Sequence, residues 1–403
     1  MNEFPGFFLA DFEYELPQSS IANFPLTERD ASKLLVYKAS NIRDDLFSCL
    51  PSYLPENCRL VLNNTRVIEA RIFFQKPTGG IIEVFCLEPF SSGDVSEAMC
   101  QVQKTQWTCL IGGASKWKPK ELLRKDILIQ DVRVEFTARY VEKKADHFII
   151  EFIWNTQHRF AEVLHAAGAI PLPPYIKRKV IEKDAISYQT IFAEKKGSVA
   201  APTAALHFTN NVFETLQEKN IGTTYLTLHV GAGTFKPVKT DNITEHHMHA
   251  ESFFVSAKAI NEILNAKIIV AAGTTSLRSL ESLHWLGVKL IKYGSFDTEL
   301  HQWEAYNLTD TITFKESLQA LLNYMQQVKK DEVFCRTSLL IIPGYRFKSA
   351  NALITNFHQP RSTLLLLVAA FIGKDWKKVY DHALKNNYRF LSYGDSSLLW
   401  RND

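Results

Sequence analysis

The first half of this 403-residue chain contains a long region with only short β-strand patterns. From about residue 71 to residue 154, apolar and polar residues alternate in short stretches that lie between turn residues: 80–85, 107–111, 132–136 and 147–152. A succession of short, evenly spaced strands is typical of a small β-barrel. We therefore predict a small barrel in this region.

The chain after residue 200 has a different pattern, in which strands alternate with helices. Apolar stretches predict buried strands at 224–230, 267–271 and 352–355, and helical spacing predicts helices at 277–285 and 362–372. This order is typical of an α/β domain. In open α/β sheets, ligands bind beyond the carboxyl ends of the strands, so the polar turns there are candidate site residues.

The composition limits the class of protein and its surroundings. With 46% hydrophobic residues, 22% charged residues and a net charge of +3, the composition is ordinary for a soluble protein, and its slight basic excess permits RNA binding. The six cysteines form no Cys-x-x-Cys pair, which argues against a disulfide framework. The acidic start lacks an export signal, and the apolar run 364–372 is too short to cross a bilayer. We expect a cytoplasmic protein in a reducing compartment.

Three polar clusters lie close together in residues 201–208, 228–235 and 246–251, and each contains histidine. Histidine is suited to proton transfer near neutral pH, and the neighbouring small residues leave room for a ligand. The sequence His246-His247-x-His249 resembles a metal motif, but carboxylate and cysteine partners at the standard spacing are absent. We predict no metal.

Two strand-to-helix or strand-to-turn segments each have a structural and a functional interpretation. The glycine turn 231–234 lacks the third glycine of a dinucleotide fingerprint. The segment 273–276 opens a helix, where its hydroxyl groups cap the helix or hold a polar ligand. Arg278 and Glu281 follow one helical turn apart, a spacing compatible with a surface ion pair of little energetic value.

The segment 170–178 is rich in proline and ends in Tyr175, Lys177 and Arg178. It is either a rigid strap between domains or a wall that stacks on an unpaired base and neutralises phosphate. The basic loop 116–120 is either a solvated hairpin tip or a further RNA contact.

Several motifs resemble those of the S-adenosylmethionine:tRNA ribosyltransferase-isomerases of queuosine biosynthesis. They cover nearly the whole chain in order: 11–17, 29–32, 63–67, 201–208, 228–235, 343–347, 353–358 and 393–395. The resemblance implies a three-layer α/β/α sandwich with an inserted small β-barrel domain. The sandwich would take residues 1–68 and 156–403, and the barrel residues 69–155.

The resemblance also implies the reaction and the partners. S-adenosylmethionine, the co-substrate, would donate its ribosyl part to the 7-aminomethyl-7-deazaguanine at the wobble position of tRNA. The product would be epoxyqueuosine, with release of adenine and methionine. We expect a monomer that binds the tRNA anticodon loop and needs neither a metal nor a membrane.

Carried onto this sequence, the resemblance gives three sets of site residues. The catalytic set, with His229 or His249 as general base, is His207, His229, His249 and His358. The co-substrate set is Thr203, Gly231, Gly233, Thr234, Gly273, Thr274, Thr275, Ser276, Arg346 and Asn356. The tRNA set is Arg66, Tyr175, Lys177, Arg178 and Arg361.

The chain departs from the family pattern at four positions and carries extra residues around 296–307. Asn64 replaces the usual Asp, Ala205 and Cys335 replace Gly, and Gln359 replaces Leu. These changes leave open a paralogue with a shifted acceptor or a non-catalytic tRNA-binding relative. A histidine-metal hydrolase is a further alternative, which the missing ligand spacing opposes.

Overall fold

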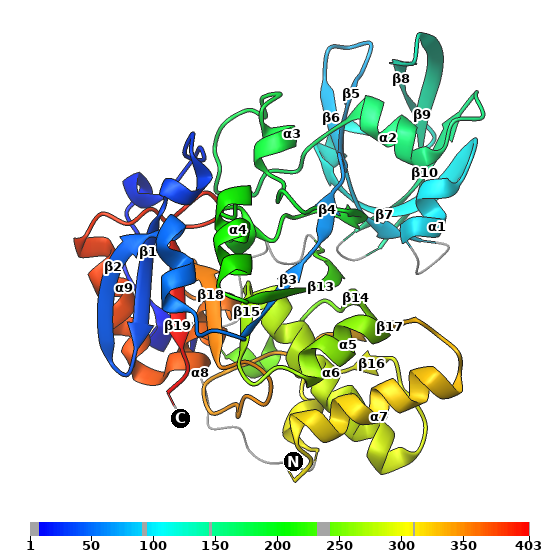
Figure 1. Ribbon diagram of the computed structural model, residues 1–403. Helices are drawn as coiled ribbons and strands as arrows, with labels where there is room; N and C mark the ends of the chain where they lie inside the picture. Colours follow the sequence, from blue (N-terminus) through cyan, green and yellow to red (C-terminus); the bar gives the residue numbers. More distant parts are fainter. Residues whose placement is uncertain (1–7, 91–94, 145–146, 232–241, 309–310, 403) are drawn as a thin grey trace.

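The structure is a computed structural model that describes residues 8–90, 95–144, 147–231, 242–308 and 311–402 (Figure 1). Its larger part is built on one mixed sheet of ten strands. In spatial order these are β16 (Glu299–Leu300), β17 (Glu332–Thr337), β14 (Glu251–Ser256), β13 (Gly222–His229), β3 (Arg59–Asn63), β15 (Ile269–Ala272), β18 (Ala352–Asn356), β19 (Ser396–Trp400), β1 (Lys33–Lys38) and β2 (Asn41–Leu46).

The centre of this sheet is parallel. β13 pairs with β3, β3 with β15, and β15 with β18, all in parallel, so four strands end at one edge. β14 and β19 run antiparallel to β13 and β18, so these two strands begin at that same edge. Six chain segments therefore enter or leave the sheet at one place.

Apolar side chains project from both faces of the sheet, as expected for strands buried on two sides. Val61 and Leu353 join one core, whereas Leu60 and Ile354 join another on the opposite face. The helices that contribute to the first core are α5 (Ala257–Leu264), α6 (Thr274–Tyr293), α7 (Phe314–Gln327), α8 (Thr363–Ile372) and α9 (Trp376–Lys385). The second core receives α4 (Asn210–Glu218) and the 3₁₀ helix Phe47–Tyr53.

The predicted β-rich region forms a separate antiparallel sheet of seven strands. Their spatial order is β11 (Gly168–Ala169), β5 (Arg71–Gln75), β6 (Ile81–Pro89), β7 (Lys104–Gly112), β10 (Phe148–Trp154), β9 (Val132–Lys143) and β8 (Leu122–Ile129). The sheet is a half-barrel with its own hydrophobic core around Trp107 and Phe152. The helices α1 (Val95–Cys100) and α2 (Phe160–Ala167) contribute side chains to this core. In Figure 1 it is set apart from the ten-stranded sheet, with β4 (Thr65–Val67) between them.

These observations confirm the mixed α/β class and the predicted strands and helices. The three-layer sandwich and the domain limits at residues 68 and 155 stay predictions. The remaining α-helix of the described residues is α3 (Asp184–Ser187), and the remaining strand is β12 (Lys195–Ser198), which pairs in parallel with β4. Among the described residues, no helix is long and apolar enough to span a membrane.

Helix α6 is the longest helix of the described chain and is buried along most of its length. Arg278 and Glu281, whose spacing is compatible with a surface ion pair, do not lie at the surface, because both side chains are buried. The Glu281 carboxylate accepts hydrogen bonds from Tyr345 Oη at 2.8 Å and from the Ser349 amide at 2.9 Å. Burial raises the pKa of Glu281. This carboxylate therefore anchors the loop that follows the Pro343-Gly344 turn.

The extra residues around 296–307 are also tied to α6. Lys289 is only 4% exposed, and its ammonium group lies 2.6 Å from Asp297 and 2.7 Å from Glu304. A buried ammonium requires such partners, because an unpaired charge is costly away from water. The insertion thus supplies the counter-charges that this buried lysine needs.

We predict that Gly287→Ala destabilises the protein. A Cβ at Gly287 would lie 2.3 Å from the carbonyl oxygen of Ser317, so α6 and α7 would have to move apart. We expect the free energy of unfolding to fall by about 1–3 kcal/mol, although alanine is the better helix former by roughly 1 kcal/mol. Urea unfolding measures this. The exposed control Lys292→Ala should stay within about 0.5 kcal/mol of the parent, and a Gly287→Ala protein of equal stability would contradict the prediction.

Candidate active site

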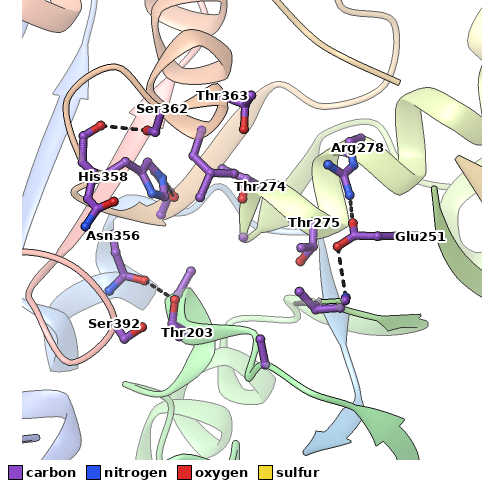
Figure 2. A pocket seen from close by; sticks show the side chains of 18 of the residues that line it. Thr203, Glu251, Thr274, Thr275, Arg278, Asn356, His358, Ser362, Thr363 and Ser392 are labelled. Atoms are coloured by element: carbon purple, nitrogen blue, oxygen red, sulfur yellow. Dashed lines mark hydrogen bonds and ion pairs between the residues drawn. The ribbon is translucent and has the colours of Figure 1, made fainter. Parts of the chain in front are cut away.

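A cavity of about 440 Å³ opens at the sheet edge where the parallel strands end. Its walls come from segments far apart in the sequence: 200–204, 230–231, 245–251, 273–275, 355–364 and 391–392. Figure 2 shows side chains from several of these segments pointing toward one another. The polar turns that were predicted as site residues after β13, β15 and β18 thus meet at one cavity.

The first turn of α6 forms part of the cavity wall. Gly273 precedes the helix with a φ of 95°, a conformation that favours glycine. In the described part of the chain, no side chain caps the helix. Thr274 and Thr275 line the cavity. Ser276 does not, because it is buried and its hydroxyl donates to the carbonyl oxygen of Ala272 at 2.8 Å.

Next to this helix, the wall carries an ion pair between Glu251 and Arg278. Glu251 is the first residue of β14 and also accepts a hydrogen bond from the Gly231 amide at 3.3 Å. Both side chains are at least nine-tenths buried. Burial lowers the pKa of Arg278 to about 10, so the guanidinium stays charged at neutral pH.

Another wall is formed by polar residues at the end of β18. The Thr203 hydroxyl donates to the side-chain oxygen of Asn356 at 3.1 Å. Asn356 is almost fully buried and its amide lies 3.5 Å from the carbonyl oxygen of Gly394. In Figure 2, Thr203, Asn356 and Ser392 lie together, on the side of the cavity away from Glu251 and Arg278.

His358 lines the cavity and is held by neighbours on both its ring and its backbone. Its Nε2 lies 2.8 Å from the Thr355 hydroxyl, and its amide donates to Tyr380 Oη at 3.0 Å. Its carbonyl oxygen accepts a hydrogen bond from Tyr14. Burial lowers the pKa of His358 to about 3, so the ring is neutral at physiological pH.

The histidine segment 246–249 lines another part of the cavity. Gln302 holds it, because its side chain accepts from the Met248 amide at 2.9 Å and donates to the His246 carbonyl at 2.6 Å. Burial, and then the charges of His249 and His247, lower the pKa of His246. Within the described ranges, no group of three or more His, Cys, Asp or Glu side chains could hold a metal ion.

The other two predicted histidines lie outside the cavity lining. His207 is buried, with its Nδ1 3.3 Å from the carbonyl oxygen of Arg29, and burial lowers its pKa to about 4. The Nδ1 of His229 lies 2.9 Å from the Thr65 hydroxyl. The His229 ring fills the space beside Gly197, where a Cβ would come within 2.7 Å of it.

The remaining co-substrate candidates differ in whether they line the cavity. Gly231 lines the cavity, whereas the side chain of Arg346 is exposed and does not. Gly233 and Thr234 lie outside the described residues.

The predicted tRNA residues also differ in their surroundings. Tyr175 lines the cavity, with its hydroxyl 2.6 Å from that of Ser392, and Arg361 lines it too. Arg66 and Lys177 are exposed. Arg178 makes two hydrogen bonds of 2.7 and 2.6 Å to Asp184, and its guanidinium lies 4.2 Å from the centre of the Phe24 ring.

The cavity is also lined by Arg278, Tyr188 and Ser392, which were not predicted from the sequence. A signal existed for Arg278, because it lies one helical turn after Thr274 and so shares a face with that residue. Ser392 directly precedes the motif 393–395. No signal in the sequence distinguishes Tyr188 from an ordinary core tyrosine.

Comparison with known proteins identifies the family. A family profile described as queuosine biosynthesis protein matches residues 9–399. A protein of Azoarcus sp. (strain BH72), named S-adenosylmethionine:tRNA ribosyltransferase-isomerase, is 37% identical over 400 residues, which cover 98% of each chain. The chain belongs to this family. A protein of the same name from Sulfurihydrogenibium sp. (strain YO3AOP1) is 38% identical over 399 residues, 97% of this chain and 99% of that one.

Among solved structures, the chain is similar to an S-adenosylmethionine tRNA ribosyltransferase from Thermotoga maritima. The two share 27% sequence identity with a TM-score of 0.46, and the match covers 96% of this chain and 99% of the other. The sequence comparisons confirm the family and the enzyme class predicted from the motifs.

Three of the four departures from the family pattern lie outside the cavity lining. Ala205 and Cys335 are buried in the cores. Asn64 accepts a hydrogen bond from the Thr227 hydroxyl at 2.6 Å and donates to Glu194 at 3.2 Å. An aspartate in place of Asn64 would face that second carboxylate, so the amide avoids repulsion. Only Gln359 of the four lines the cavity.

We predict that His207 makes the protein less stable at acidic pH. Its pKa is about 4 in the folded protein against 6.5 when unfolded, so the unfolded state binds more protons between these values. Its contribution to stability is therefore complete above pH 6.5 and is lost as the pH falls toward 4. Measured by urea unfolding from pH 7 to 4.5, His207→Gln should reduce the slope of stability against pH by about 1.4 kcal/mol per unit. A slope equal to that of the parent would contradict this.

Proposed function

We propose that the protein transfers and isomerises the ribosyl part of S-adenosylmethionine onto the 7-aminomethyl-7-deazaguanine at the wobble position of tRNA. The product is epoxyqueuosine, and adenine and methionine are released. The observation that supports this most is the cavity at the sheet edge, which is lined by residues of three of the motifs that carry the resemblance, 201–208, 228–235 and 353–358. A cavity of about 440 Å³ falls within the usual range for small-molecule sites.

The reaction requires several proton transfers. A base must remove a proton from the carbon beside the sulfonium, whose positive charge stabilises the carbanion. Adenine then leaves, the neutral acceptor amine attacks, and the epoxide oxygen displaces methionine. We assign the general base to His249, because it lines the cavity and histidine exchanges protons near neutral pH.

His358 has a different role in this proposal. Because its pKa is about 3, it is a weak base and remains a neutral hydrogen-bonding group. The Thr355 hydroxyl fixes one ring nitrogen. We assign His358 to hold a ribose hydroxyl or a ring nitrogen of adenine, together with Asn356 and Thr203. His207 and His229 then support the fold around the cavity without touching substrate.

The predicted tRNA contacts are assigned according to their exposure, their place at the cavity and their hydrogen-bond partners. Arg66 and Lys177 are exposed and available to phosphate, and Tyr175 supplies an aromatic ring at the cavity for the flipped-out base. Arg178 donates to Asp184 and to the carbonyl oxygens of Asn23 and Lys179, so we assign that arginine to the structure of the proline segment. Arg361 lies at the cavity and remains a candidate for a tRNA phosphate.

A shifted acceptor is the second candidate function. Gln359 is the observation that favours it, because this departure from the family lines the cavity and adds an amide there. Nucleoside analysis of modified tRNA distinguishes the two functions, since a different acceptor base gives a product of different mass.

We predict that His249→Gln slows adenine release from S-adenosylmethionine by roughly 100-fold or more in the presence of precursor tRNA. His358→Gln should lower the rate less, because it removes a hydrogen bond and not the base. Chromatography of adenine measures the release. The control is His301→Gln, an exposed histidine outside the cavity lining, which should keep the parental rate. Unchanged turnover of His249→Gln would contradict the assignment of the base.

We also predict that the double variant Arg66→Gln/Lys177→Gln weakens tRNA binding. Each lost phosphate contact should reduce the slope of log affinity against log salt by about 0.7–0.9, without a change in co-substrate affinity. Filter binding at several salt concentrations measures the slope. Lys315→Gln, on the exposed side of α7, is the matched control. An unchanged slope in the double variant would show that these cations do not contact phosphate.

A further inference from the structure

Opposite charges are held side by side in the corner of the cavity between β14 and α6. Glu251 and Arg278 both line the cavity and are both at least nine-tenths buried. Burying an ion pair costs desolvation free energy, which apolar residues of similar size would not incur. A pair kept at the wall of a cavity can offset that cost by binding a ligand with complementary charges.

Arg278 keeps hydrogen-bond donors for such a ligand. A guanidinium has five N–H donors, and the ion pair with Glu251 is made through one terminal nitrogen, Nη2. The Nε is buried and has no hydrogen-bond acceptor among the described residues, so the donors that a cavity ligand can reach are those of the terminal nitrogens. Glu251 is fixed from its other side by the Gly231 amide. Glu251 therefore holds Arg278 in place, while the guanidinium keeps donors for an anionic group.

The first turn of α6 adds a second source of positive potential. This helix has 20 residues, and its opening residues Thr274 and Thr275 line the cavity next to Arg278. The first N–H groups of a helix have no acceptor within it, and none of the described side chains caps α6. These amides and the helix dipole favour a carboxylate at this position.

A small apolar recess continues from the same corner. It shares Thr274, Thr275, Glu251 and Arg278 with the main cavity. It is also lined by Thr363 and by aliphatic or thioether side chains: Met248, Leu339, Leu340, Ile341, Leu364 and Leu367. Of these, Met248, Thr363 and Leu364 line the main cavity as well. The corner thus combines a cation, an anion and a small apolar space.

We propose that this corner binds the zwitterionic amino-acid end of the co-substrate. The α-carboxylate lies against Arg278 and the first amides of α6, the α-ammonium group against Glu251, and the S-methyl group at the apolar recess. This orientation places the adenosine end toward Asn356 and Ser392, on the other side of the cavity in Figure 2. The inference rests on the proposed function, because it takes S-adenosylmethionine as the ligand.

The first test uses the unaltered protein. Free methionine carries both charges, 3-methylthiopropylamine lacks the carboxylate, and N-acetylmethionine lacks the ammonium group. We expect only methionine to compete with S-adenosylmethionine in equilibrium binding. Equal competition by all three compounds, or by none, would overturn the proposed contacts.

The second test assigns the contact to Arg278. The ratio of the affinities for S-adenosylmethionine and its decarboxylated analogue should be roughly 10-fold to 100-fold in the parent. In the paired variant Glu251→Gln/Arg278→Met, which leaves no unpaired buried charge, the ratio should fall to about one. Arg278→Lys should restore part of the preference. A folding defect lowers both affinities alike and leaves their ratio unchanged. A change in the ratio therefore reports the loss of the carboxylate contact and not a loss of folded protein.

The outcomes also separate this inference from the proposed function. If the protein releases adenine but binds the two ligands equally well, the reaction stands and the zwitterion site is wrong. A parental preference that persists in the paired variant would likewise overturn the role of Arg278. If S-adenosylmethionine does not bind at all, both proposals fail.

Discussion

The parallel pairing of β13, β3, β15 and β18 determines where this protein can have a site. Parallel strands end at one edge, so the segments that follow them must all turn there. β14 starts at the same edge because it runs antiparallel to β13. Polar residues separated by more than 150 positions, such as Thr203 and Asn356, therefore come within hydrogen-bonding distance. A ligand site at this edge follows from the topology of the sheet.

Helix α6 fixes one wall of that site, and buried polar groups fix the helix. Glu281 binds the amides of the loop after Tyr345, and Lys289 binds the acidic side chains of the insertion. Both contacts lie further along the same helix than Thr274 and Arg278. Because a helix is rigid over this length, these contacts also set the position of the residues at the cavity. The insertion around 296–307 thereby supports the site from outside it.

Much of the fold could be predicted because the local pattern determines it. The strand at 352–355 and the helix at 362–372 were found by apolar spacing alone, and their bounds differ from the prediction by one residue. The β-rich region was found in the same way, although its strands form a half-barrel sheet. The arrangement of strands within each sheet could not be derived from local spacing.

The site was predicted at the level of segments but not of side chains. His229 ends β13, where neighbours alternate in direction, so Leu228 and Val230 enter the core and the His229 ring turns to Thr65. Arg278 and Glu281 have the spacing of a surface pair, but each has a partner elsewhere in the fold. Arg278 forms an ion pair with Glu251 of β14, and Glu281 accepts a hydrogen bond from Tyr345. Such outcomes depend on which strand lies beside which, and a local pattern does not contain that information.

In the proposed reaction, the cavity directs the ribosyl part of S-adenosylmethionine, and not its methyl group, to tRNA. The most direct measurement uses S-adenosylmethionine labelled with ¹³C in the ribose and with deuterium in the methyl group, followed by mass analysis of the tRNA nucleosides. We expect a modified 7-deazaguanosine that carries all five ribose ¹³C atoms and no deuterium, with the deuterium in free methionine. Deuterium in the nucleoside, or tRNA without ribose label, would contradict this expectation.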